Sequence, residues 1–397
     1  MKARTFKCIT AMILSGALLA SFPLAAQAQT NSIPPAPLGS GRQPTFTIFD
    51  VQGADERDCG LGTFANFVNA SGAILGNYGD ASIVVHGFLR APDGAITTVD
   101  VPDAARGPGQ GTHTGGFNNA GEITGSYADA NNAAHGYVRA PNGDITTFDA
   151  PGAGTGSGQG TVPGNINSAG EIGGYYVDAS GVAHAFLRAR DGTLLAFDAP
   201  GAGTGSGQGT FTGFFDELND AGAFVGSYVD ASGVNHGFVR APRGAITAID
   251  VPGAGTGAGQ GTSAGLINEE GVIGGTYFDA SSVAHGFVRP PNGAITTFDV
   301  PGAGTGPGQG VYPQDINPAG VSSGLFIDAS TVVHGFVRAR NGAITAFDAP
   351  GAGTGSTCGV FPGTGQGTYV SSINPAGAIA GSLVDANGVA HGFLRSP

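Results

Sequence analysis

Seven histidines recur with carboxylates at fixed spacing, and they are the residues of this sequence best suited to chemistry. An Asp stands six residues before each His, and a second Asp follows six of the seven after 14 residues. An imidazole between two carboxylates can bind a metal ion or act as a general base. Each His opens the phrase His-Gly/Ala-Phe/Tyr-Leu/Val-Arg, at His86, His135, His184, His236, His285, His334 and His391.

Repetition favours a structural role for these histidines. A catalyst normally needs one copy of its His–carboxylate pair, whereas an imidazole that ties neighbouring strands together through two hydrogen bonds is needed in every repeat. We therefore interpret the seven His as structural repeat residues, and we predict no catalytic residue, no metal site and no cofactor. The recurring Arg, from Arg90 to Arg395, lies four residues after its His on the same strand face. We expect it to pair with a neighbouring carboxylate.

Glycine-rich phrases such as that at 253–261 have the composition of phosphate-binding loops but not their context. A Walker loop needs Gly-Lys-Ser/Thr, and the only two Lys of the chain are Lys2 and Lys7. A dinucleotide-binding loop is followed by a helix, and here a strand pattern follows. We interpret these loops as crossings between strands, where Gly permits turns with positive φ.

The first 28 residues read as a signal peptide. A basic start with Lys2, Arg4 and Lys7 precedes an apolar run over 8–26 and a small-x-small cleavage site that ends at Ala28. The sequence therefore predicts secretion, to the periplasm or outside the cell, with 29–44 as a flexible leader. The remaining 13 Arg stand against 29 acids, a formal net charge of −16. This charge argues against nucleic acid and anionic membrane surfaces as partners, and no later apolar run is long enough for a membrane span.

The repeat predicts the fold. Its period is 49 residues, stretched to 52 and 57 in two places. Within 262–300, short β-branched and aromatic runs at 262–267, 272–279, 284–289 and 294–300 are separated by Asn/Gly and Pro/Gly turns. Four strands per unit, repeated seven times, predict an all-β, seven-bladed β-propeller of four-stranded antiparallel blades over 45–397. A β-helix is the alternative, although its rungs are usually shorter.

The two ends of the repeat region complement one another. The run at 45–51 matches the fourth strand of a unit without its first three, and the chain stops at 397 just after a third strand. We expect the N-terminal strand to pair with the C-terminal blade and close the ring, which removes the open sheet edges.

The pattern Ile-Asn-x-x-Gly, then Gly-x-Tyr-x-Asp, then His-Ala/Gly-Phe resembles the HAF-type bacterial extracellular repeat family. His184-Ala185-Phe186 carries the family's literal signature, and the other six units have His-Gly-Phe or His-Gly-Tyr. The resemblance covers about 45–397. It implies secretion and a repeat architecture, and it supplies no catalytic residue.

Departures from the repeat are the candidate ligand contacts. We define the upper face as the face that carries the turns between second and third strands and the loops between units. The extra residues of the 52- and 57-residue repeats are expected in these loops between units. Insertions confined to one face of a repeat protein usually mark the face that binds ligands. The alternative is that the sequences of the loops near the ring closure depart from the repeat only because ring closure relaxes the structural constraints on them. The candidate residues are Asp55, Glu56, Arg57, Asp58, Asp103, Arg106, His113, Phe214, Phe215, Asp216 and Glu217.

Two cysteines remain after removal of the signal peptide, Cys59 and Cys358, in loops predicted to flank the closure. We predict a disulfide between them, with two surface thiols as the alternative. For function, we expect an extracellular binding or interaction module with an unidentified glycan or protein ligand. The alternatives are a secreted polysaccharide hydrolase or lyase with carboxylates in the funnel, and a purely structural matrix protein.

Overall fold

The computed structural model describes residues 43–56, 61–212, 217–291, 293–360 and 364–397. The predicted signal peptide (1–28) and most of the predicted leader lie outside these ranges. Within them the chain is all-β: every described regular element is a strand, and none is a helix. It follows that no described segment is a helix long and apolar enough to cross a membrane.

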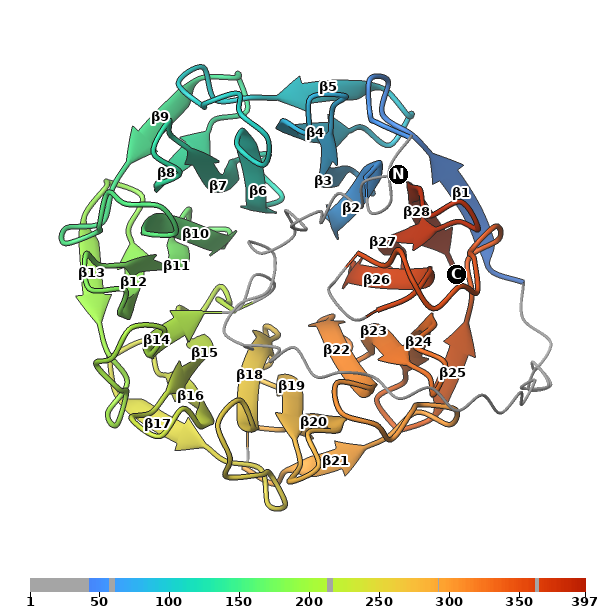
Figure 1. Cartoon of the computed structure of the whole chain (residues 1–397). Helices are drawn as coiled ribbons and strands as arrows, with labels where there is room; N and C mark the ends of the chain where they lie inside the picture. The colour runs from blue at the N-terminus through green and yellow to red at the C-terminus, as the bar shows by residue number, and fades with distance from the viewer. Residues whose placement is uncertain (1–42, 57–60, 213–216, 292, 361–363) are drawn as a thin grey trace, which may run out of the picture.

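The strands form repeated four-stranded antiparallel units, and Figure 1 shows these units side by side around a central axis. The innermost strands are β2 (Thr63–Val68), β6 (Thr112–Phe117), β10 (Gly160–Ile166), β14 (Gly209–Thr212), β18 (Gly261–Ile267), β22 (Gly310–Ile316) and β26 (Gly367–Ile373). The second strands are β3 (Ile74–Gly79), β7 (Ile123–Ala128), β11 (Ile172–Val177), β15 (Phe224–Val229), β19 (Ile273–Phe278), β23 (Ser322–Ile327) and β27 (Ile379–Val384).

The remaining strands form the outer half of each unit. The third strands are β4 (Val85–Arg90), β8 (Ala134–Arg139), β12 (Ala183–Arg188), β16 (Asn235–Arg240), β20 (Ala284–Arg289), β24 (Val333–Arg338) and β28 (Ala390–Ser396). The outermost strands are β5 (Ile96–Val99), β9 (Ile145–Phe148), β13 (Leu194–Phe197), β17 (Ile246–Ile249), β21 (Thr296–Phe298), β25 (Ile344–Phe347) and β1 (Thr45–Phe49).

Consecutive units are joined by short parallel bridges from the third strand of one unit to the first residue of the next. Ala134 of β8 pairs with Gly160 of β10 in this way, and Gly160 has φ +109°. A Cβ on Gly160 would collide with the carbonyl oxygen of Ala134, so both the backbone conformation and the close approach require glycine there. Through these bridges and the antiparallel ladders, the strands form one 24-stranded mixed sheet and the four-stranded sheet β2–β5.

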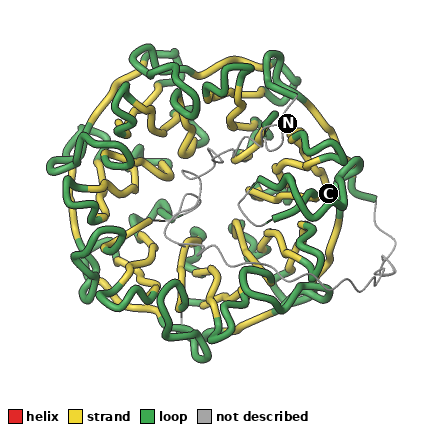
Figure 2. The backbone as a smooth tube through the Cα atoms, viewed as in Figure 1, coloured by secondary structure: helices red, strands yellow, loops and turns green. Residues whose placement is uncertain are grey.

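The N-terminal strand pairs with the last strand of the chain. β1 runs antiparallel to β28, with Thr45 opposite Ser396 and Phe49 opposite Gly392. β1 therefore supplies a fourth strand to the unit formed by β26, β27 and β28, as the sequence predicts. Figure 2 shows the strands and loops alternating in the same way from one unit to the next.

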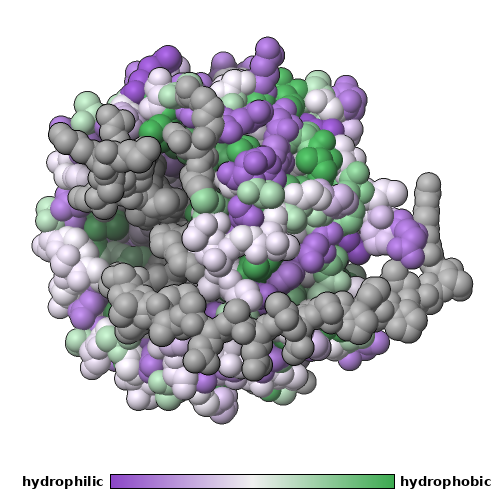
Figure 3. Space-filling model, turned by 45° about the vertical axis from the view of Figure 1, so that its right-hand side comes forward, coloured by the Kyte–Doolittle hydropathy of each residue, from purple (hydrophilic) through white to green (hydrophobic). Residues whose placement is uncertain are grey.

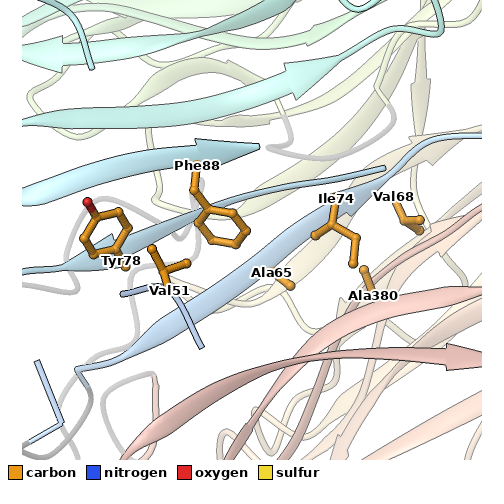
Figure 4. Close-up of a cluster of buried hydrophobic side chains, with 7 residues drawn as sticks. All are labelled: Val51, Ala65, Val68, Ile74, Tyr78, Phe88 and Ala380. Carbon is orange, nitrogen blue, oxygen red and sulfur yellow. The ribbon is translucent and has the colours of Figure 1, made fainter. Parts of the chain in front are cut away.

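The core is divided into clusters of buried side chains that lie within and between units. One of them, drawn in Figure 4, joins the first and last units: Ala380 of β27 packs with Ala65 and Val68 of β2 and with Ile74 of β3. All four side chains are buried. Hydrophobic burial therefore connects segments more than 300 residues apart in the sequence.

The recurring Arg makes a different contact from the predicted one. The guanidinium of Arg240 lies over the ring of Phe197, which belongs to the outermost strand of the preceding unit, at 4.9 Å from the ring centroid. Arg90, Arg188, Arg338 and Arg395 contact Phe rings of their preceding units at 4.6–4.8 Å. Among the described residues, Arg188 also interacts electrostatically with the nearby carboxylate of Asp191, and the contact that all five Arg share is the aromatic ring rather than the predicted carboxylate. A guanidinium is attracted to the face of an aromatic ring, and Arg240 and Arg338 are buried where they make this contact.

Candidate functional site

The seven recurring His occupy equivalent positions between two carboxylates. In each unit Nδ1 lies 2.7–3.0 Å from the Asp that follows the outermost strand, and Nε2 lies 3.5–3.8 Å from the Asp of the turn between second and third strands. His391 takes its outer partner, Asp50, from the other end of the chain. The imidazole therefore links three consecutive segments of a unit, through one hydrogen bond and one longer ion-pair contact where sequence reasoning expected two hydrogen bonds.

The turn aspartates are held in place by the backbone. Asp178 Oδ1 accepts hydrogen bonds from the amides of Ser180 (2.8 Å) and Val182 (2.9 Å). The hydrogen bond from the Val182 amide lowers the pKa of Asp178, and the contacts with Ser180 and His184 lower it further. Burial acts in the opposite direction but is outweighed. Tyr176 stacks on His184 at 4.9 Å between ring centroids; four other units have the same Tyr–His stack, and in a fifth Phe326 replaces the Tyr. In the part of the chain that the structure describes, no group of His, Cys, Asp and Glu is arranged to hold a metal ion.

One histidine shows the electrostatic consequence of this arrangement most clearly. Burial alone would lower the pKa of His334, but hydrogen bonds to Asp328 and Asp348 outweigh it and raise the pKa to about 9. The same contacts lower the pKa of Asp328, against the effect of its burial. His334 is therefore an imidazolium that holds two carboxylates near neutral pH, which is a structural rather than a general-base arrangement.

The glycine-rich loops are filled by their own glutamine. In the loop at 154–160, the amide of Gly156 donates to Gln159 Oε1, and Gln159 Nε2 donates to the carbonyl of Ala179 in the adjacent turn. The corresponding Gln of five other loops makes the same pair of hydrogen bonds. The amide that would cradle a phosphate is thus already bonded within the protein.

The structure places the predicted ligand-binding residues in several different environments. Glu56, Asp103 and Arg106 are exposed in the loops before β2 and β6, whereas Asp55 is buried and its amide donates to Gly79 O. The role of these residues as ligand contacts stays a prediction. Arg57, Asp58, Phe214, Phe215 and Asp216 lie outside the described residues, as does Cys59, so the Cys59–Cys358 disulfide also stays a prediction.

Glu217 lies away from the upper-face loops. The three extra residues of the 52-residue repeat fall near 211–217 in the sequence. Because β14 already begins at Gly209, and Leu218 bridges to Phe224, these extra residues do not precede the innermost strand as the sequence predicts. Glu217 is fully buried there, and its Oε1 accepts from the amide of Asn165 in the preceding unit (2.8 Å). Asp315 is similarly buried on β22, with Oδ2 accepting from Ile373 N (2.6 Å). Both inner carboxylates thus bridge neighbouring units.

His113 lies in strand β6, opposite Ser126 of β7, and not in a loop. Its Nε2 is buried and has no hydrogen-bond partner among the described residues. Burial lowers the pKa of His113 to about 4, so the ring is neutral at physiological pH. A neutral ring offers no positive charge, so this environment does not suit contact with an anionic ligand, and the contact of His113 with any other ligand stays a prediction.

The recurring Asn has a role that sequence reasoning missed. Its Oδ1 accepts from backbone amides of its own turn, as Asn374 does from Ala376 and Ala378, and its Nδ2 donates to the backbone carbonyl of the same Asn in the next unit. The signal was visible as an invariant Asn-x-x-Gly spacing. These links join Asn118 to Asn167, Asn167 to Asn219, Asn219 to Asn268, Asn268 to Asn317, Asn317 to Asn374, and Asn374 to Asn69.

A cavity of about 220 Å³ opens inside this circle of Asn turns, on the face opposite the upper face. Its lining includes the apolar residue before each recurring Asn and, except for one unit, the Asn itself. Three acids, Asp220, Glu269 and Asp315, and no Lys or Arg line it. Elsewhere on the surface, the side shown in Figure 3 mixes hydrophilic and hydrophobic residues in small groups.

Comparisons with known proteins indicate a fold and no family. No protein-family model matches this sequence, and neither does any curated protein. Similarity at the structural level is found with the BP39L lectin from Burkholderia pseudomallei, with 10% identity and a TM-score of 0.52 over 86% of this chain and 100% of the lectin.

A puromycin hydrolase matches with 11% identity and a TM-score of 0.51, over 84% of this chain and 53% of the hydrolase. This chain therefore corresponds to about half of the hydrolase. A mutant Aleuria aurantia lectin, solved with alpha-methyl-L-fucoside, has 10% identity and a TM-score of 0.40 over 72% of this chain and 93% of the lectin. At such identities the likeness to the first two structures concerns the fold alone.

Proposed function

We propose that the chain is a secreted carbohydrate-binding protein built as a closed seven-bladed β-propeller. Ring closure is supported by the β1–β28 pairing and by contacts between the first and last units through Asn374 and Asn69. Secretion rests on the sequence of residues 1–28 and on the resemblance to HAF-type repeats. The predicted Cys59–Cys358 disulfide belongs to the same proposal, because it would brace the junction in an oxidising compartment.

The main observation in favour of a binding function is that the His–carboxylate groups are used for contacts within the protein. Every recurring His–Asp arrangement is used to tie strands in its unit, and the buried inner acids Glu217 and Asp315 bridge backbones of neighbouring units. What the described residues leave for a ligand is a set of exposed polar loops and an open polar cavity. The fold likeness to a lectin that the chain covers completely favours a carbohydrate as ligand.

We propose the loops before β2 and β6 as one binding surface, with Glu56, Asp103 and Arg106 as its exposed described residues. Hydroxyl groups of a glycan would donate to the two carboxylates and accept from the guanidinium. Such a patch is polar and irregular, unlike the repeated scaffold around it.

The test is a screen of the mature protein on a glycan array, followed by titration calorimetry on each hit. Asp103→Asn combined with Arg106→Ala is expected to weaken binding at this surface by at least tenfold, while Tm changes little because both side chains are exposed. The control is Arg243→Ala, which removes an exposed Arg from a turn on the opposite face. If the wild-type protein binds no glycan on the array, the proposed function is refuted.

A further inference from the structure

We infer that the cavity inside the circle of Asn turns is a second glycan site, which takes a single neutral sugar ring. The inference rests on the proposed function, and it assigns the opposite face of the molecule to a ligand that the upper-face loops do not contact. Residues from all the repeat units line the cavity, from Phe67 in the first unit to Pro375 in the last.

The floor and the rim of this cavity differ in polarity. The residues just before the recurring Asn form an apolar floor; Ile166, Ile267 and Ile373 are examples. The residues just after the recurring Asn form the rim. One sector of the rim is polar, with Asn119, Ser168, Asp220 and Glu269, and the remainder is apolar, with Ala70, Pro318 and Pro375. A sugar ring has matching surfaces, because its C–H faces are apolar and its edge carries hydroxyls.

The polar sector is held rigidly before any ligand arrives. Asp220 accepts two hydrogen bonds from Ser168, from the amide to Oδ1 (2.7 Å) and from the hydroxyl to Oδ2 (2.7 Å). The amide of Asp220 in turn donates to Glu269 Oε2 (2.9 Å). Each carboxylate oxygen of Asp220 accepts one of these hydrogen bonds and has a second lone pair that can accept from a ligand hydroxyl. Because these side chains are already ordered, binding does not have to pay for their immobilisation.

Charge and size restrict the ligand further. The lining contains three acids and no Lys or Arg, so uronic acids, sulfated sugars and phosphates are repelled. The volume of about 220 Å³ is below the roughly 300–1,000 Å³ of pockets that enclose drug-sized ligands. A neutral sugar at the end of a chain, with its remainder in solvent, satisfies both limits.

The experiment is calorimetric titration with neutral hexasaccharides of glucose, mannose and xylose, and with hexagalacturonate as the anionic counterpart. We expect at least one neutral probe to bind and hexagalacturonate to bind at least tenfold more weakly. Asp220→Ala with Glu269→Ala should weaken the neutral probe at least tenfold. Ala70→Trp, which fills the rim without changing charge, should do the same. Asp144→Asn is the control, because Asp144 is an exposed acid of the same face outside the cavity lining.

The outcomes separate this inference from the proposed function. Glycan binding that is lost in the Asp103→Asn/Arg106→Ala variant and unchanged in both cavity variants would overturn the cavity site and leave the function standing. Stronger binding of hexagalacturonate than of every neutral probe would also overturn it. Absence of binding by any glycan, in the array and in calorimetry, would overturn both.

Discussion

His391 Nδ1 lies 2.8 Å from Asp50 Oδ1, although the two residues are 341 positions apart in the sequence. In every other unit the His and its outer Asp are 14 positions apart. The N-terminal segment thus supplies the one carboxylate that the last repeat lacks. The geometry at this junction equals that of an uninterrupted unit.

Replacing Asp50 should therefore cost as much stability as replacing the outer Asp of an internal unit. We expect Asp50→Asn and Asp149→Asn each to lower the free energy of unfolding by about 1 kcal/mol, since each loses a partly exposed charged hydrogen bond to His. Urea unfolding of both variants measures this, with Asp144→Asn as an exposed control. A large loss in Asp149→Asn with none in Asp50→Asn would mean that the N-terminal strand is not docked in solution.

Asn374 gives a second test of the junction. Its Nδ2 donates to Asn69 O (3.0 Å), and Asn219 makes the equivalent bond to Asn268 O (3.1 Å) within the chain. Asn374→Ala and Asn219→Ala should each destabilise by about 1–3 kcal/mol, because a partly or fully buried carbonyl loses its donor. The comparison is made by chemical unfolding against Asn387→Ala, whose side chain lies in an exposed turn. An effect of Asn374→Ala no larger than that of Asn387→Ala would contradict the link between the Asn turns of the last and first units.

His334 should make stability depend on alkaline pH. Its folded pKa of about 9 exceeds the unfolded value of about 6.5, so its contribution is complete below pH 6.5 and disappears as the pH rises through about 9. We expect the stability difference between wild type and His334→Gln to shrink from pH 6 to pH 9.5. Melting curves across this range measure it. A difference that stays constant, or grows with pH, would refute a charged His334.

His113 should act with the opposite sign. Its folded pKa of about 4 lies below the unfolded value, so the unfolded chain takes up a proton first as the pH falls below about 6.5. Wild type should lose up to about 2 kcal/mol of stability from this site between pH 6.5 and pH 5. His113→Val, which copies Val162 at the corresponding position of the next unit, should remove that loss. If wild type and His113→Val lose the same amount of stability between pH 6.5 and pH 5, His113 is hydrated or paired in solution.

The cysteine prediction is tested chemically. If Cys59 and Cys358 form a disulfide, titration of the denatured, unreduced mature protein should find no free thiol. A bridge across 299 residues restricts the unfolded chain and raises the free energy of unfolding by up to about 4–5 kcal/mol. Reduction should remove this contribution and therefore lower Tm. Two free thiols in the unreduced protein would end the idea, and Cys59→Ser/Cys358→Ser would then match wild type in Tm.

The sequence by itself determined the all-β class, the four strands of each unit and the structural use of the recurring His. These follow from local patterns: alternating apolar residues and Gly turns act within a few residues, and the His–Asp spacing fits neighbouring strands of one hairpin. The match between the two chain ends also predicted that β1 pairs with β28, because the missing and the supplied strand could both be read from the repeat.

Only the tertiary structure decided contacts between units, because their partners are about 50 residues away and a repeat offers several equivalent choices. It placed Arg240 over Phe197, where sequence reasoning expected a carboxylate, and it buried Glu217 next to the Leu218–Phe224 bridge, where sequence reasoning expected an upper-face loop. It also brought the residues beside each recurring Asn together around one cavity. Asp220 and Glu269 are unremarkable turn residues in the sequence, and they become neighbours only because successive units turn about a common axis.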